Sequence, residues 1–315
     1  MMPSTIASAL AAAKRTAAPV AAVEVVATAL RPPVRPEYEH PLPPLGVLVL
    51  SQPLPWLQRV WGVAAVRRVL ILAVLAAAWQ ALALWQDNDL LLPSFTDTVQ
   101  SLVDDTRSGE LLAKAGISLA VLVQGYLLGI AGALLLTTLA VSTQLGRDLL
   151  STLTSMLNPL PAIALLPLAL LWFGLGQGSL LFVLVHSVLW PLALNTYAGF
   201  QAVPETLRMA GRNYGLHGVR YVLQILIPAA LPSILSGLKI AWAFAWRTLI
   251  AAELVFGASS GKGGLGWYIF QNRNELYTDK VFAGLLTVIA IGLAVETLGF
   301  HTLERFTVRK WGVQR

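Results

Sequence analysis

The chain has 315 residues, of which 56% are hydrophobic and 12% are charged, and its formal net charge is +6. A soluble domain of this length carries about 25% charged residues, so the composition argues against a soluble enzyme and indicates a membrane protein. The chain has no cysteine, which excludes disulfides and thiolate metal sites, and its 4 histidines show no spacing that predicts a metal site.

The amino-terminal part differs in composition from the rest. Residues 1–53 are rich in alanine and then in proline, without an apolar run long enough for a span, and we expect a disordered cytoplasmic tail. A cleaved signal peptide is the alternative, because Lys14 and Arg15 precede small residues, but Glu24 interrupts the apolar core of such a peptide. Residues 54–66 carry leucine and tryptophan at helical spacing, which predicts an amphipathic helix at the membrane interface.

From residue 67 to 315 the sequence predicts a transmembrane domain. Each of its apolar segments is long enough to cross about 30 Å of hydrocarbon. Backbone groups in lipid must be hydrogen-bonded within the segment, and no segment alternates as a barrel strand does, so we expect an all-α integral membrane fold. The six expected transmembrane helices are 69–86, 115–142, 149–173, 179–202, 225–256 and 281–302.

The basic residues predict the orientation, because Lys and Arg favour cytoplasmic loops. With the amino terminus inside, the cytoplasmic segments hold 15 basic and 6 acidic residues, whereas the outer segments hold 5 basic and 8 acidic residues. We therefore expect both termini in the cytoplasm, and the positive net charge does not indicate a nucleic-acid partner. An ion within a span is costly and marks a functional candidate. The intramembrane charges are Lys239, Arg247, Glu253 and Glu296.

Arg247 is the main candidate for contact with an anionic solute in a translocation pathway. A guanidinium beside aromatic faces suits a planar or tetrahedral oxyanion, and Trp242 and Trp246 lie on the same expected helix. Glu253 is a further pathway candidate. It lies six residues after Arg247 on the same expected helix, which places the two side chains well apart around the helix axis. The alternative is that Arg247 pairs with Glu253 or Glu296 of a neighbouring helix while the tryptophans anchor the interface.

The third and fourth spans add further pathway candidates. Three prolines between 159 and 167 each remove a backbone hydrogen bond, so we expect the third span to bend, and such a bend can act as a gate. Asn158 precedes the bend, where it can cap the helix or touch solute. His186 and Trp190 lie one turn apart on the fourth span, and a histidine that is hydrogen-bonded within the bundle is the alternative for His186. Lys239 and Glu296 can snorkel or pair between helices.

The loop 203–224 is too polar to cross the membrane and predicts a short helix. Pro204 lies in its first turn, Glu205 follows near the positive end of the helix dipole, and Gly215 stands where the helix would stop. Its apolar side consists of Leu207, Met209, Ala210 and Tyr214. Its basic side consists of Arg208 and Arg212. Such a helix is suited to be gripped by another protein, and a surface helix that covers the bundle is the alternative.

The run Met-Ala-Gly-Arg-Asn-Tyr-Gly at 209–215, followed by Ile225 and Pro228, resembles the EAA motif of binding-protein-dependent ABC importer permeases. In that family the motif is the coupling helix, which lies in a cleft of the ATP-binding subunit. The resemblance implies that 205–216 is the coupling loop. The residues it assigns to coupling are Glu205, Arg208, Met209, Ala210, Gly211, Arg212, Tyr214, Gly215 and Pro228.

The motif departs from the family pattern at three positions, one of which is Ile227, which precedes Pro228 where Leu is usual. Met209 stands where the motif has Glu, and Gly211 stands where it has the second Ala. The polar anchoring credited to that Glu can be supplied instead by Arg208 or Arg212. Other stretches resemble the nitrate, sulfonate and taurine permeases in particular. These stretches are 161–168, 172–176, 195–199, 203–204, 230–234 and 264–266.

The resemblance implies a type I ABC importer permease (MetI-like) fold, with five core spans and one peripheral span, in the inner membrane of a bacterium. It implies two copies of this chain around one pathway, two ATP-binding subunits below it and a periplasmic or lipid-anchored solute-binding protein above it. ATP and Mg²⁺ would be bound by the partner ATPase, so we expect no catalytic residue, metal or cofactor in this chain. The expected solute is a small anion of the sulfonate, taurine or nitrate type, imported into the cytoplasm.

Two other classes of function are open from the residues alone. A secondary transporter driven by an ion gradient predicts inverted repeats and carboxylates near the membrane midplane, and neither is evident. A membrane-embedded enzyme needs several His, Asp or Glu residues at membrane depth, and the spans hold too few of them.

Overall fold

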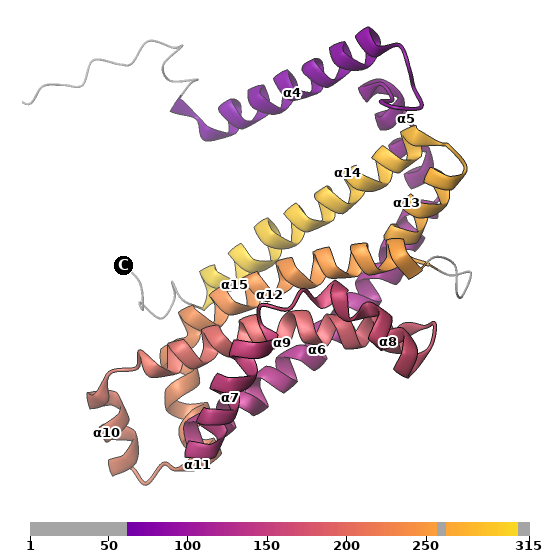
Figure 1. The fold of residues 1–315 in the computed structure, drawn as a ribbon. Helices are drawn as coiled ribbons and strands as arrows, with labels where there is room; N and C mark the ends of the chain where they lie inside the picture. The colour runs from indigo at the N-terminus through magenta and orange to yellow at the C-terminus, as the bar shows by residue number, and fades with distance from the viewer. Residues whose placement is uncertain (1–61, 257–262, 308–315) are drawn as a thin grey trace, which may run out of the picture. The chain divides into compact units, whose positions relative to one another are not determined.

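The computed structural model describes residues 62–256 and 263–307, and every regular element in this part of the chain is a helix (Figure 1). The chain divides into two units between Arg67 and Arg68, and the account below concerns the second. The expected tail 1–53 and nearly all of the expected interfacial helix 54–66 lie outside the described residues. The all-α prediction is confirmed for the part that the structure describes.

Within the described ranges, 5 helices are long and apolar enough to cross a membrane, or 6 spans if one bent pair is counted as a span. Leucine and alanine dominate these helices, and both are good helix formers. The span that begins at Glu110 starts earlier than the expected residue 115. The spanning helices are α4 (Ala64–Gln86), α6 (Glu110–Ser142), α9 (Gln177–Gln201), α12 (Ile227–Phe256) and α14 (Thr278–Ala294).

The expected third span, 149–173, is not one helix. Helix α7 (Gln144–Leu157) ends before the prolines, and the 3-10 turn η1 (Ala162–Leu165) and helix α8 (Leu166–Phe173) follow it at an angle of 89°. Proline lacks an N–H donor and restricts the residue before it, so two closely spaced prolines end the helix instead of only bending it. The expected bend is therefore present as a break in the helix, and residues 158–161 form a non-helical linker.

Shorter helices flank the spans. A π-helical turn η2 leads into α12, and a second one, η3, extends α14, so the last span is longer than the expected 281–302. These elements are α5 (Phe95–Arg107), α10 (Glu205–Asn213), α11 (Gly218–Tyr221), η2 (Val222–Leu226), α13 (Leu265–Asn274), η3 (Val295–Phe300) and α15 (His301–Phe306).

The core of this unit consists of α6, α9 and α12, of which α9 packs along both of the others (Figure 1). Glycines on α6 allow this approach: a Cβ at Gly125 would lie 2.6 Å from Leu184 Cβ, and one at Gly129 would lie 2.5 Å from Val188 Cβ. Helices in lipid gain little from hydrophobic association, so close packing at small residues holds them together. The packing fixes α9 and α12 side by side, and these helices carry most of the candidate site.

Candidate functional site

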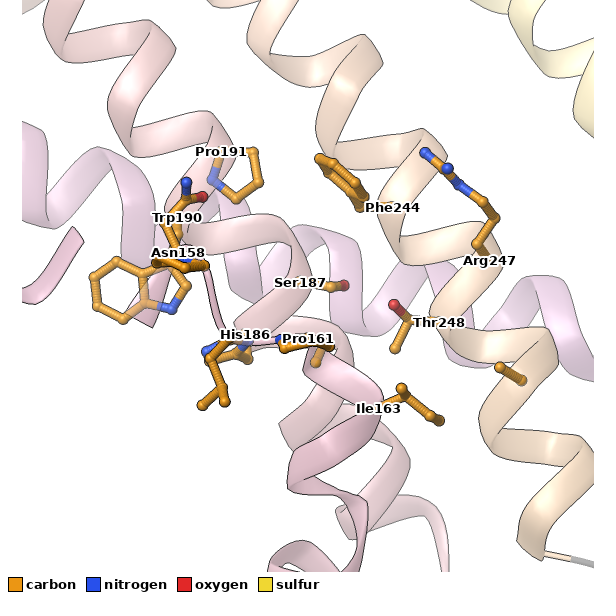
Figure 2. A pocket seen from close by; sticks show the side chains of 14 residues that line it. Asn158, Pro161, Ile163, His186, Ser187, Trp190, Pro191, Phe244, Arg247 and Thr248 are labelled. Carbon is orange, nitrogen blue, oxygen red and sulfur yellow. The ribbon is translucent and has the colours of Figure 1, made fainter. Parts of the chain in front are cut away.

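A cavity of about 520 Å³ lies between α9, α12 and the linker that follows α7. We call it the central pocket, and it is lined by 158–163, His186, Ser187, Trp190, Pro191, Phe244, Arg247, Thr248 and Ala251. Figure 2 shows Arg247, Phe244 and Thr248 on one side of it and Asn158, His186 and Trp190 on the other. Four of the seven pathway candidates from the sequence therefore line one cavity: Asn158, His186, Trp190 and Arg247.

Arg247 supplies the positive charge of the central pocket. Its Nε donates a hydrogen bond to the carbonyl of Ala243 at 2.9 Å, and its guanidinium carbon lies 5.0 Å from the ring centre of Phe244. Within the described residues, the terminal Nη atoms have no hydrogen-bond partner, and Arg247 forms no ion pair with Glu253 or Glu296. The guanidinium is therefore oriented by its own helix and by an aromatic face, while most of its donors remain available.

His186 and Trp190 add further donors. Their rings meet edge to face with centres 6.1 Å apart. The ring nitrogens of both residues are buried and have no hydrogen-bond partner among the described residues. An unpaired buried polar group costs about 1–3 kcal/mol, so such groups favour a bound solute or water. The structure therefore does not give His186 the partner within the bundle that the alternative interpretation expects.

Glu253 lies apart from the central pocket and has a different environment. It is only 5% exposed, and its two carboxylate oxygens accept hydrogen bonds from Ser118 Oγ at 2.9 and 2.8 Å. The backbone N–H of Gly266 donates to the same carboxylate at 2.8 Å, and that of Leu265 donates to Ser118 Oγ at 2.8 Å. This network ties the first turn of α13 to α6 and α12.

A smaller cavity of about 260 Å³ lies between α12, the end of α14 and η3. We call it the lateral pocket, and it is lined by Lys239, Trp242, Ala243, Trp246, Arg247, Gly292, Glu296 and Phe300. The two tryptophans therefore line a different cavity from the central pocket, and Arg247 borders both. Lys239 pairs between helices, as one expectation had it, but its partner is Glu304 of α15.

The short helix expected at 204–214 is present as α10. Pro204 is its N-cap residue, and Gly215 follows it with a φ of +73°, a left-handed conformation that glycine adopts at little cost. Gly211 faces the bundle, where a Cβ would lie 3.0 Å from Ile225 and 3.1 Å from Tyr221. The small residue at 211 thus lets α10 pack directly on the segment that leads into α12.

Arg208 has a role that the sequence did not indicate. Its guanidinium donates hydrogen bonds to the carbonyls of Phe200 at 2.5 Å and Val203 at 3.1 Å, which lie at and just after the end of α9. It is therefore engaged with the membrane domain and is not free to replace the motif Glu at a partner surface. Arg212 is exposed, and Glu205 lies 3.8 Å from Arg208 and 4.0 Å from Arg212.

Several apolar residues of α10 and its C-cap are exposed. Met209 is 50% exposed and Tyr214 is 86% exposed, and Leu207 and Ala210 are exposed beside them. Pro228 is the second residue of α12 and follows directly on the π-helical turn η2. The coupling candidates therefore divide into residues that anchor α10 and residues that it presents outward.

A second polar cluster was missed at the sequence level. Tyr268 of α13 donates a hydrogen bond to Asp105 of α5, and Lys280 Nζ of α14 lies 3.1 Å from the other oxygen of that carboxylate. Burial raises the pKa of Tyr268, and the hydrogen bond to Asp105 raises it further. The three residues are far apart in sequence, so no spacing signal could have found them.

Comparison with known proteins agrees with this architecture. Residues 117–306 match the family described as binding-protein-dependent transport system inner membrane component. A putative ABC transporter permease of Methanocaldococcus jannaschii is 31% identical over 73% of this chain and 87% of its own length. A putative aliphatic sulfonates transport permease of Escherichia coli is 30% identical over 75% of this chain and 88% of its own length. A nitrate import permease of Synechocystis sp. is 29% identical over 73% of this chain and 85% of its own length.

These matches decide the class of protein. The relatives are named as transport permeases, so the expectation of a translocation component that is not an enzyme is confirmed, and ATP-driven import is favoured over the ion-gradient alternative. The family implies an ATPase partner and a solute-binding protein, and the apolar helices agree with a multi-pass membrane protein. Because the match covers more than half of the chain, the chain belongs to the inner membrane components of binding-protein-dependent transport systems, the permease subunits of ABC importers.

Proposed function

We propose that this permease moves a small anion of the sulfonate, taurine or nitrate type into the cytoplasm, and that the central pocket is part of its path. Relatives of this chain are named for aliphatic sulfonates, taurine, nitrate and bicarbonate. The solutes in these names share a negatively charged group with two or three oxygen atoms. A path for them needs positive charge and hydrogen-bond donors without competing carboxylates.

The observation that carries the proposal is the chemistry of the central pocket. Its lining contains the guanidinium of Arg247 and no Asp or Glu. His186 and Trp190, whose ring nitrogens are buried and unpaired among the described residues, belong to the same lining. Hydrogen bonds from a charged donor to an oxyanion are about twice as strong as neutral ones, and guanidinium suits planar and tetrahedral oxyanions.

The same proposal covers the partners and the orientation. The exposed apolar surface of α10, within the loop 205–216 and its EAA-like motif, would dock in a cleft of a separate ATP-binding subunit, which binds ATP and Mg²⁺. Two copies of this chain, two ATP-binding subunits and a periplasmic or lipid-anchored solute-binding protein would form the importer. Both termini would lie in the cytoplasm of a bacterial cell, as the distribution of basic residues favours.

The contacts of α10 provide a route for mechanical coupling. Arg208 bonds α10 to the end of α9, and Gly211 packs α10 against the segment that enters α12. Helices α9 and α12 carry opposite walls of the central pocket. Movement of α10 when the ATPase dimer closes would therefore shift both walls, and the pocket would open alternately to the two sides of the membrane.

Uptake of a labelled sulfonate, taurine or nitrate tests the proposal. The intact importer is reconstituted in proteoliposomes with its ATPase and its solute-binding protein. Loss of charge-assisted hydrogen bonds worth about 1.5–3 kcal/mol predicts that Arg247→Gln lowers uptake about tenfold or more, and Arg247→Lys recovers part of it. Arg305→Gln is the matched control, because Arg305 is exposed on α15 and lies outside the described pockets. Wild-type uptake by Arg247→Gln at equal protein levels would refute the proposal.

A further inference from the structure

A third cavity of about 560 Å³ lies along one face of α7. We call it the α7 pocket, and its polar lining residues are Arg147, Ser151, Thr154, Ser155, Asn158 and Tyr197. We infer that the α7 pocket is a second anion subsite, in which Arg147 receives the solute after it leaves the central pocket on the way to the cytoplasm. The inference rests on the proposed function and extends it by a named residue that the sequence did not single out.

The two pockets are adjacent. Asn158 and Pro159, which follow α7, line both the central pocket and the α7 pocket. Backbone that is not helical is tolerated at membrane depth only where protein buries it or where it lines a cavity with water. The linker 158–161 therefore lies at the junction of two stretches of one path.

The chemistry of the α7 pocket matches that of the central pocket. Its lining contains Arg147 and no Asp or Glu. Tyr197 Oη accepts a hydrogen bond from Gln201 Nε2 at 2.8 Å, so the phenol proton is free to be donated to a solute. By contrast, Ser155 donates its hydroxyl proton to the carbonyl of Ser151 at 2.8 Å. Positive charge and one neutral donor in a lining without carboxylates favour an anion over a cation.

The two arginines lie toward opposite ends of this path. Arg147 is in the first turn of α7, and 11 residues of rise place it about 16 Å along the chain from Asn158. The start of α12 is expected on the same side of the membrane as Arg147. Arg247 lies 20 residues, or about 30 Å of helix, beyond that start. An anion that leaves Arg247 loses its counter-charge in a medium of low dielectric constant, and a second guanidinium lowers that barrier.

The absence of cysteine from the chain allows a direct measurement of the local potential. Ser151 is one helical turn from Arg147 and lines the same pocket, so a thiol in Ser151→Cys reports the field of that guanidinium. In the assembled importer, the thiol is modified with a negatively charged and with a positively charged methanethiosulfonate, and the two rates are compared by mass spectrometry of this chain. The reagents differ by two charges, so the ratio of the rates doubles the sensitivity to the potential.

The expected result is a fall in the negative-to-positive rate ratio of about fivefold when Arg147→Gln is added to Ser151→Cys. Arg147→Lys keeps the charge and should keep the ratio. Thr302→Cys is the matched control, since Thr302 is exposed on α15 and outside the α7 pocket, and its ratio should not respond to Arg147→Gln. An unchanged ratio at Ser151→Cys, or an equal change at Thr302→Cys, would overturn the inference.

Uptake separates this inference from the proposed function. Arg147→Gln should lower uptake of the anionic solute several-fold, while Arg147→Lys transports at near the wild-type rate and both variants copurify with the ATPase. If Arg247→Gln stops uptake and Arg147→Gln does not change it, the release subsite is refuted and the proposed function stands. If Arg247→Gln leaves uptake unchanged, the proposed function fails, and the rate ratio alone then decides whether the α7 pocket attracts anions.

Discussion

The buried network around Glu253 makes a prediction about local stability. Its carboxylate accepts hydrogen bonds from Ser118 Oγ and from the N–H of Gly266, and Ser118 in turn accepts one from the N–H of Leu265. Glu253→Ala removes the acceptor for two buried donors, whereas Glu253→Gln keeps a carbonyl oxygen for one of them and replaces the other oxygen with an uncharged NH2 group. The two substitutions should therefore loosen the first turn of α13 to different degrees.

The magnitude follows from the number of donors that lose their partner. Hydrogen bonds to a charged group are worth about 1.5–3 kcal/mol, so the alanine variant should lower the free energy of local opening by about 3 kcal/mol. The glutamine variant should lower it by about 1 kcal/mol, because its carbonyl oxygen still accepts a hydrogen bond from one of the two donors. Converted to equilibrium constants, these values are factors of about one hundred and about five.

Hydrogen exchange reads these factors directly, since the exchange rate of an amide follows its opening equilibrium. The measured amides are those of Leu265 and Gly266 in the purified importer, followed by mass spectrometry. Glu296→Ala is the matched control, because Glu296 is an exposed carboxylate on η3 and its loss should not change exchange at α13. The reasoning is refuted if the alanine variant exchanges at the wild-type rate, or if the glutamine variant exchanges as fast as the alanine variant.

Three further predictions concern packing, pH and coupling. Gly129→Leu places a side chain against α9 and should lower the free energy of unfolding by about 1–3 kcal/mol or more. Gly116→Leu, which lies in open space on the same helix, should not lower it. Thermal melts compare the two variants, and equal melting temperatures would contradict the packing argument. Burial raises the pKa of Tyr268 above its usual value of about 10, so the hydrogen bond from its protonated hydroxyl to Asp105 stabilises the fold fully below that pH, and this stabilisation is lost as the pH rises. The difference in melting temperature between the wild type and Tyr268→Phe should therefore narrow from pH 8 to pH 11. A constant difference would contradict this assignment. Arg208→Ala should weaken the α9–α10 junction by about 2 kcal/mol and lower the amount of solute moved per ATP hydrolysed. The substitution Arg212→Ala, at an exposed residue, should leave that amount unchanged. Solute moved per ATP is measured in proteoliposomes, and equal values for the two variants would argue against the route through α9.

Hydropathy predicted the spanning helices well because lipid leaves the backbone few choices. Four of the expected spans appear as helices close to their predicted bounds, and the second begins earlier, at Glu110. The expected span 149–173 is broken in the structure, because Pro159 and Pro161 remove two helical hydrogen bonds that a count of apolar residues does not register. The prolines carried the signal of a break, but the sequence alone could not give its angle of 89°.

The functional residues show the same division between local and distant information. The helix at α10 was predictable, because Pro204 before it and Gly215 after it are local signals. The engagement of Arg208 was not predictable, because it depends on how the end of α9 meets the start of α10. Likewise, the intramembrane position of Glu253 marked it as special, but only the packing of α6 against α13 shows what it binds.

The linker 158–161 connects the two kinds of information. Prolines in an apolar run predict backbone groups without helical partners, and such groups are stable at membrane depth only where they are buried in protein or line a cavity that admits water. In the structure this linker borders both the central pocket and the α7 pocket, with Arg247 on one of them and Arg147 on the other. A proline-broken span with an arginine in reach on either side is therefore a pattern that can be sought in sequence, and under the proposal above it marks a positively charged path for an anion.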